Sequence, residues 1–219
     1  MKDLPDISAY FIGQRAVDEE ISWLMNGSYK KKTAIVNAGI EKYGIKSIVE
    51  WGCRSGLIAA GLPKAIPYLG MDTNEDWLEM AKERNRNCST RKFMLTDIRK
   101  NIADPEPDWL NYSLARGVVI AFDFMKHMPL GEWDAILKRV LSCGRYCCFS
   151  AQVCGNDFDD GTRFHHVFVS KQHLAEAIQR AGYEELSRQT LSEWRLPSGD
   201  MASDIEVWTI IRSSEEERT

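Results

Sequence analysis

The spacing of apolar residues changes once along this chain, near residue 45. Before that point, apolar side chains recur at the three- to four-residue interval of an amphipathic helix. Residues 21–25 (Ile-Ser-Trp-Leu-Met) fit one helix that ends near Asn26-Gly27, and residues 29–43 fit a second helix that Gly44 would end. The pattern therefore predicts two N-terminal helices, which we assign to a helical cap over residues 1–44.

From residue 45 onward, short strand-like segments alternate with helical ones. The strand-like segments cover residues 47–50, 66–71, 91–96, 117–122 and 145–150, and helical segments begin near residue 57 and cover 74–86 and 131–141. The 117–122 segment is apolar throughout, which is typical of a central parallel strand buried on both faces. Strands separated by helices in this way predict an α/β fold with a doubly wound, mostly parallel sheet.

The last part of the chain breaks this alternation. Residues 164–169 are strand-like and 171–181 are helical, but the strands expected at 183–189 and 205–212 have no helix between them. A loop that contains Pro197, Ser198 and Gly199 joins these two strands. We therefore expect an antiparallel C-terminal hairpin at one sheet edge, and one compact unit formed by residues 45–219 together with the cap.

Composition narrows the class of partner. The chain has 219 residues, 44% of them hydrophobic and 27% charged, as in an ordinary globular domain. A net charge of -4 speaks against extensive contact with nucleic-acid phosphates. The basic run from Lys30 to Lys32 fits a solvated helix start, with a contact to a phosphate or an acidic substrate as the alternative. No apolar run reaches the roughly 20 residues of a membrane span, and the acidic start is unlike a signal peptide, so we expect a cytoplasmic protein with no membrane partner.

Six cysteines raise the question of a metal site, because Cys143, Cys147, Cys148 and Cys154 lie close together in sequence. Cys147 and Cys148 fall inside an expected strand, where neighbouring side chains point to opposite faces. These two thiols could not easily share one zinc ion. We therefore interpret them as small buried strand residues and expect no metal.

Four polar segments follow the expected strands at their carboxyl ends, which is where ligands bind to open parallel sheets. They are residues 49–56 (Val-Glu-Trp-Gly-Cys-Arg-Ser-Gly), 70–72 (Gly-Met-Asp), 95–98 (Leu-Thr-Asp-Ile) and 121–124 (Ala-Phe-Asp-Phe). The glycine turn in the first segment lets a ligand approach the backbone, and the helix start after it offers N–H groups to an anion. Asp72 in the second segment can accept two hydrogen bonds from a ribose diol. Each acid alone also fits a turn or a helix cap.

In this order and spacing, the four segments resemble the class I S-adenosylmethionine-dependent methyltransferases. The resemblance covers about residues 45–150, and the Ala181-Gly182-Tyr183 ending of the later helix adds to it. It implies a Rossmann-like fold and S-adenosylmethionine as the cofactor.

The resemblance also implies roles for individual residues. In the family, the glycine turn lies under the methionine part of the cofactor, which here implies Glu50, Gly52, Cys53 and Gly56. The acid after the second strand holds the ribose, which implies Asp72 with Thr73, and the acid after the third strand receives the adenine amino group, which implies Asp97 with Ile98. The segment after the fourth strand faces the methyl group, which implies Phe122, Asp123, Phe124 and His127. Asp123 and His127 are the catalytic candidates, since a base is needed when the acceptor is protonated.

One residue departs from the family's turn, which usually reads Glu-x-Gly-x-Gly-x-Gly. Arg54 stands where the middle glycine is expected. Its side chain could obstruct the cofactor, or it could pair with the cofactor's carboxylate, for which a guanidinium is well suited. We count Arg54 among the cofactor-binding residues. A dinucleotide dehydrogenase is disfavoured, because its Gly-x-Gly-x-x-Gly pattern is absent.

The methyl acceptor is less well defined. The 123–126 segment lacks the Asn/Asp-Pro-Pro-aromatic run of enzymes that methylate amines of DNA bases. We expect a small-molecule acceptor, with a protein side chain as the second choice and a non-catalytic S-adenosylmethionine-binding protein as the alternative function. Several further residues fit either an acceptor-side role or a plain structural one. These are the bases His165 and His166, the aromatic residues Tyr10, Phe11, Trp23 and Tyr29, and the polar 155–164 loop with Asp157, Asp159, Asp160 and Arg163.

Overall fold

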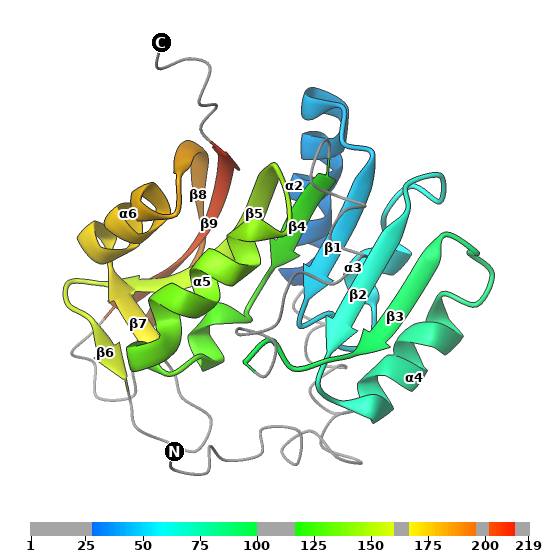
Figure 1. The fold of residues 1–219 in the computed structure, drawn as a ribbon, viewed down its shortest axis with the longest axis horizontal. Helices are drawn as coiled ribbons and strands as arrows, with labels where there is room; N and C mark the ends of the chain where they lie inside the picture. The colour runs from blue at the N-terminus through cyan, green and yellow to red at the C-terminus, as the bar shows by residue number, and fades with distance from the viewer. Residues whose placement is uncertain (1–27, 100–116, 160–166, 196–201, 213–219) are drawn as a thin grey trace. The chain divides into compact units, whose positions relative to one another are not determined.

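A computed structural model describes residues 28–99, 117–159, 167–195 and 202–212 (Figure 1). The chain divides into two compact units, Met1–Asp97 and Ile98–Thr219. In the described part of the chain, no helix has the length and apolar character needed to cross a membrane.

The first unit is a parallel sheet with helices. Its described elements are α2 (Ser28–Tyr43), β1 (Ser47–Trp51), α3 (Leu57–Ala60), β2 (Tyr68–Asp72), α4 (Glu75–Arg84) and β3 (Arg91–Leu95). β2 pairs in parallel with β1 on one side and with β3 on the other. The Asn74 side chain begins α4 by accepting a hydrogen bond from the backbone N–H of Trp77 at 3.1 Å. Acidic residues in the first turn of α4 and basic residues in its last turn complement the helix dipole.

The second unit combines a parallel and an antiparallel part. Its described elements are β4 (Gly117–Ala121), η3 (Met125–His127), η4 (Leu130–Glu132), α5 (Trp133–Ser142), β5 (Tyr146–Cys154), β6 (Phe158–Asp159), β7 (Val167–Ser170), α6 (Lys171–Arg180), β8 (Tyr183–Arg195) and β9 (Ala202–Arg212). β8 and β9 pair antiparallel with each other. α5 and α6 lie side by side and pack on β4, β7 and β8 (Figure 1).

β5 is the central strand of the second unit. β9 pairs antiparallel with it from Tyr146 to Val153, which occupies one edge of the strand. The other edge therefore carries both parallel partners in succession, with β4 opposite Tyr146 to Phe149 and β7 opposite Gln152 to Cys154. Every residue of β4 is buried, as the apolar run predicted.

The α/β class, the parallel strands and the Rossmann-like character predicted from the sequence are confirmed. Several elements differ in length from the prediction; β8, for example, continues to Arg195, six residues beyond its predicted end. β5 continues to Cys154, four residues beyond its predicted end, because pairing with β7 and β9 extends it. α3 has only four residues, since Gly61 and Pro63 follow it closely. The predicted helix at residues 21–25 lies outside the described residues.

The basic run at the start of α2 is divided. Lys30 and Lys31 are exposed, as predicted for a solvated helix start, whereas Lys32 is only 1% exposed. Lys32 lies one helical turn before the buried Val36, which places it on the face of α2 that packs inward. The solvated interpretation is therefore wrong for Lys32.

Cys147 and Cys148 of β5 are buried, as predicted from their place in a strand, whereas Cys154 at its end is partly exposed. Cys147 and Cys148 carry free thiols at 0% and 4% exposure. Cys143, just before the strand, is also fully buried, and its Sγ donates to the carbonyl of Arg139. These buried side chains belong to the apolar core of the second unit.

Candidate functional site

The turn between β1 and α3 has a left-handed backbone at three residues. Gly52, Arg54 and Gly56 have φ values of 70°, 48° and 69°. A Cβ atom at Gly56 would lie 2.9 Å from Nδ2 of Asn85 and 3.0 Å from Cβ of Ala81, so a larger residue would not fit there. Arg54 thus has a left-handed backbone conformation, which costs a residue other than glycine about 1–2 kcal/mol.

The N–H groups of this turn are largely committed to the chain itself. Those of Gly52 and Cys53 donate to the carbonyl oxygen of Met71 at 2.8 and 3.0 Å, and that of Gly56 donates to Cys53 at 2.9 Å. The backbone N–H of Arg54 donates to Oδ2 of Asp72 at 2.9 Å. These four N–H groups are therefore engaged within the chain, whereas the groups expected to face an anion are those at the start of α3.

The side chain of Arg54 packs on an aromatic ring. Its Cζ lies 5.0 Å from the ring centroid of Trp77, the residue whose N–H is capped by Asn74. Trp77 is buried, and Arg54 is partly exposed. The cation–π contact holds the guanidinium beside the turn.

Asp72 ends β2 with both carboxylate oxygens engaged by the backbone. Oδ2 accepts from Arg54, and Oδ1 accepts from the N–H of Asn74 at 3.0 Å. Burial raises the pKa of Asp72 above its usual value, and the backbone hydrogen bonds from Arg54 and Asn74, followed by the charge of Arg54, offset part of that increase. A carboxylate has about four acceptor sites, so Asp72 keeps acceptor capacity beyond its backbone hydrogen bonds with Arg54, Thr73 and Asn74. The adjacent Thr73 is exposed.

Glu50 has a different environment. It is 3% exposed, and the hydroxyl of Tyr68 donates to its Oε2. Burial raises the pKa of Glu50 to about 8, and the Tyr68 hydrogen bond and the charge of Lys32 offset only part of the effect. The carboxyl group of Glu50 is therefore buried and mostly protonated at neutral pH, and its hydrogen bond with Tyr68 joins β1 to β2.

The remaining residue of the first unit with an expected role is Asp97. It follows β3 and is partly exposed. The backbone N–H of Thr96, one residue earlier, donates to the carbonyl oxygen of Asp72 at 2.9 Å. The ends of β2 and β3 thus bring Asp72 and Asp97 to the same edge of the first unit. Ile98, the first residue of the second unit, is buried.

In the second unit, the loop after β4 carries the two catalytic candidates. Phe122 is buried, whereas Asp123 and His127 are partly exposed. Asp123 has a left-handed φ of 54°, and its N–H donates to Oγ of Ser150 on β5 at 2.7 Å. Its carboxylate lies 3.9 Å from Nζ of Lys126, with the two side chains 11% and 20% exposed. The loop is thereby anchored to β5, and the charge of Asp123 is partly balanced.

Several of these partners were not identified from the sequence. Lys126 could have been found, because it stands three residues after Asp123 at helical spacing. Trp77, Ser150 and Tyr68 come from other elements and gave no local signal. Tyr29 is described as a partly buried residue of α2. Tyr10, Phe11, Trp23, His165, His166, Asp160 and Arg163 lie outside the described residues.

A polar cavity of about 610 Å³ lies at the carboxyl end of β5. Residues 153–157 line one side of it, and residues 170–172, at the start of α6, line the other. Asp157 from the 155–164 loop is therefore part of a cavity wall.

No protein-family model matches the chain, and no curated protein matches it by sequence. Solved structures do match it. Magnesium protoporphyrin IX methyltransferase from Synechocystis PCC 6803 with bound S-adenosylmethionine is 15% identical, with 97% of this chain and 98% of that chain covered and a TM-score of 0.70. The 1,6-didemethyltoxoflavin-N1-methyltransferase from Burkholderia thailandensis is 15% identical, with 90% and 83% covered and a TM-score of 0.63.

A third match is the [4+2]-cyclase SpnF, which is 17% identical, with 84% of this chain and 81% of that chain covered and a TM-score of 0.62. Identities this low carry the fold and not the activity. Over nearly its full length, the chain has the Rossmann-like fold of the class I S-adenosylmethionine-dependent methyltransferases.

Proposed function

We propose that this protein is an S-adenosylmethionine-dependent methyltransferase with a small-molecule acceptor. The observation that carries the proposal is the carboxylate of Asp72. It stands at the end of β2, fixed by backbone N–H groups of Arg54 and Asn74, next to the left-handed turn.

The residues of the first unit fit the cofactor. The two hydroxyls of a ribose are donors, and the carboxylate of Asp72 keeps acceptor capacity beyond its backbone donors. Asp97 follows the neighbouring strand and would accept a hydrogen bond from the adenine amino group. The guanidinium of Arg54 is the cation that the cofactor's carboxylate would meet in the turn.

When bound, the cofactor supplies an electrophilic methyl group on a sulfonium. The protein's task is then mainly to orient the acceptor. Asp123 and His127, on the loop after β4, are the groups that would take a proton from a protonated acceptor. The hydrogen bond from Asp123 N–H to Ser150 keeps this loop in one conformation.

The cavity at the end of β5 has the volume of a small-molecule site, and neither Asp123 nor His127 is among the described residues that line it. About 610 Å³ falls within the range of about 300–1,000 Å³ for small-molecule sites. The magnesium protoporphyrin IX and didemethyltoxoflavin methyltransferases share the fold and take small molecules.

A second candidate is a protein that binds S-adenosylmethionine without transferring its methyl group. Two observations favour it: arginine in place of the turn glycine, and a [4+2]-cyclase among the proteins with this fold.

Calorimetric titration with S-adenosylmethionine and S-adenosylhomocysteine tests both candidates, since each requires binding. Absence of binding by the folded protein would refute both. Protein incubated with methyl-labelled S-adenosylmethionine and a cell extract should then transfer label to the low-molecular-mass fraction. Tight binding without transfer to any fraction would favour the non-catalytic candidate.

A further inference from the structure

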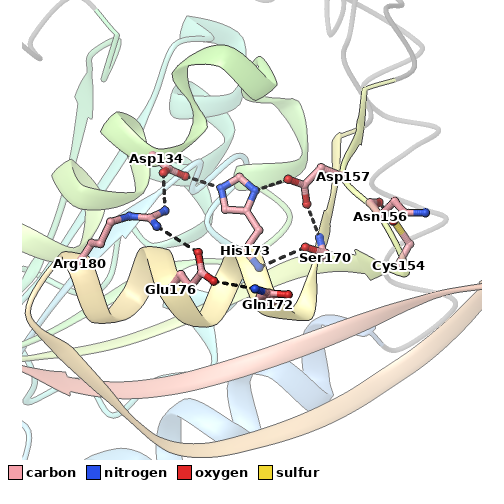
Figure 2. Close-up of polar contacts among 9 residues, drawn as sticks. All are labelled: Asp134, Cys154, Asn156, Asp157, Ser170, Gln172, His173, Glu176 and Arg180. Atoms are coloured by element: carbon pink, nitrogen blue, oxygen red, sulfur yellow. Dashed lines mark hydrogen bonds and ion pairs between the residues drawn. The ribbon is translucent and has the colours of Figure 1, made fainter.

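His173 of α6 forms short hydrogen bonds with two carboxylates. Its Nδ1 lies 2.5 Å from Oδ2 of Asp157, and its Nε2 lies 2.6 Å from Oδ1 of Asp134. Figure 2 shows the imidazole between these two acids, which come from the segment after β5 and from α5. We call these three residues the His173 bridge.

The bridge is held on both sides by further contacts. The other oxygen of Asp157 accepts from the N–H of Ser170 at 2.6 Å, and the other oxygen of Asp134 accepts from Arg180 at 2.8 Å. Arg180 also pairs with Glu176 on the same helix (Figure 2). Asp157 thus occupies the N-terminus of α6, and both carboxylates are fixed in position.

The bridge connects the cavity wall to the loop with the catalytic candidates. The ring of His173 packs edge-on against Trp133 at 5.7 Å, and Nε1 of Trp133 donates to the carbonyl of Met125 in η3 at 3.2 Å. Met125 lies between Asp123 and His127. η3 also contacts β5 and β7.

Two carboxylate partners require a proton on each ring nitrogen, so the bridge needs the imidazolium form. Burial acts to lower the pKa of His173, but the hydrogen bonds and charges of Asp134 and Asp157 outweigh it, and the net pKa is raised. Burial likewise acts to raise the pKa of Asp157, but Ser170 and His173 bring the net pKa below its usual value.

We propose that His173 is a positioning residue for the acceptor side of this methyltransferase. Its imidazolium holds the cavity wall around Asp157 and, through Trp133 and Met125, the loop that carries Asp123 and His127. The assignment of the loop to the acceptor side rests on the proposed function. The coupling between the His173 bridge and that loop rests only on the contacts described above.

The sign of the pH dependence follows from these shifts. A raised histidine pKa adds stability that is complete below the unfolded value of about 6.5 and is lost as pH rises through the folded pKa. A lowered Asp157 pKa adds stability above about 3.8 that is lost as pH falls through the folded value. The charged groups that face the ring or its partners are Asp134, Asp157, Arg180 and Glu176, with the thiol of Cys154 beside Asp157. The bridge should therefore be intact from weakly acidic to neutral pH and open at alkaline pH.

Amide hydrogen exchange of the full chain between pH 6 and 9 tests the proposal. Rates are divided by the intrinsic exchange rates of an unstructured chain of the same sequence at each pH, which removes the intrinsic pH dependence. Protection of residues 153–159 and 122–133 should fall together by about threefold to tenfold, the scale of an ionic contact near the surface. Unchanged protection of residues 122–133 would overturn the coupling.

Two variants sharpen the test. His173→Gln should lower protection in both segments at pH 6 and abolish the pH dependence, whereas His173→Arg, which keeps the charge and two donors, should retain protection up to pH 9. Gln179→Ala, at an exposed position of α6, is the matched control and should behave as wild type. If His173→Gln does not fold, the comparison of wild type with His173→Arg still tests the proposal. Arginine would not restore exchange protection at alkaline pH if the histidine acted only through its shape.

S-adenosylmethionine titration separates this proposal from the proposed function. All three variants should bind S-adenosylmethionine as wild type does, because the residues expected to hold its ribose belong to the first unit. Loss of cofactor binding in wild type would refute the methyltransferase and leave the exchange result standing. Unaltered exchange with normal cofactor binding would refute only the role of His173.

Discussion

Replacing Arg54 by glycine separates two roles that one residue could have in the turn. The backbone there is left-handed, with φ of 48°, and the guanidinium packs on Trp77 near Asp72. Glycine would relieve about 1–2 kcal/mol of backbone strain. It would also remove a cation–π contact of about 0.5–1 kcal/mol and add about 0.5–1 kcal/mol of unfolded-chain entropy. These terms nearly cancel, so we expect the free energy of unfolding to change by no more than about 1 kcal/mol.

Affinity for S-adenosylmethionine should respond much more strongly than stability. Strain in the turn is present with and without ligand, so its relief leaves affinity largely unchanged. Loss of the guanidinium removes the cation available to the cofactor's carboxylate, since the N–H groups of Gly52, Cys53 and Gly56 are committed within the chain. A charge-assisted hydrogen bond contributes about 1.5–3 kcal/mol, so Kd should rise about 10- to 150-fold. The pKa of Asp72 should also rise further, which would make the loss larger at pH 5.5 than at pH 8.

The assay is calorimetric titration of wild type, Arg54→Gly and Arg54→Ala with S-adenosylmethionine and with an analogue that lacks the carboxylate. Arg54→Ala is the matched control, because it removes the guanidinium and keeps the strain. Both variants should lose affinity for the full cofactor, and thermal unfolding should show alanine as the less stable of the two. Tighter binding by Arg54→Gly would refute the reasoning. An equal loss for both ligands would mean that Arg54 acts on the turn itself.

Three further predictions concern acids of the first unit. Asp72→Asn should bind S-adenosylmethionine about 10- to 100-fold more weakly, since a charged acceptor is lost; a folded variant with wild-type affinity would contradict the ribose role. Asp97→Asn should show a moderate loss in the same titration, because a flipped amide can still offer its oxygen, and unchanged affinity in both Asn and Ala variants would remove Asp97 from the site. For Glu50, a pKa of about 8 in the folded chain against 4.5 unfolded means that the unfolded chain loses its proton first, so stability should fall as pH rises from about 5 to 8. Denaturant unfolding at several pH values should show this fall in wild type and a flatter profile in Glu50→Gln, and equal slopes would be evidence against the buried acid.

The sequence predicted most of the elements because their signals are local. Apolar runs such as residues 117–122 and glycines such as Gly44 and Gly56 determine strands and turns within a few residues of themselves. Asp72 and Asp97 could be placed at strand ends for the same reason. What escaped prediction depends on partners distant in sequence. The last four residues of β5 are strand because β7 and β9 pair with them, not because of their composition.

The same limit applies to the side chains of the sites. From the sequence, Lys32 is one of three lysines predicted to be solvated. In the structure, the packing of α2 buries it near Glu50. His173, Asp134 and Asp157 are each ordinary polar residues in sequence, and only the packing of α5, α6 and the segment after β5 brings them together. The hydrogen bonds from the N–H groups of Gly52 and Cys53 to Met71 likewise depend on how β2 packs against that turn.

The burial of Cys147 and Cys148 in β5 makes these two cysteines internal reporters of unfolding. Cys147 and Cys148 are 0% and 4% exposed and point to opposite faces of the sheet, so a thiol reagent can reach them only when the second unit opens. Cys88, on the first unit, is partly exposed, and its pKa is lowered by the neighbouring Thr90 hydroxyl, with smaller contributions from Arg91 and Lys64. In the native chain, Cys88 should therefore react quickly with a thiol reagent, and Cys147 and Cys148 should react slowly. The delay between their labelling times measures the rate at which the second unit opens completely, without any introduced probe.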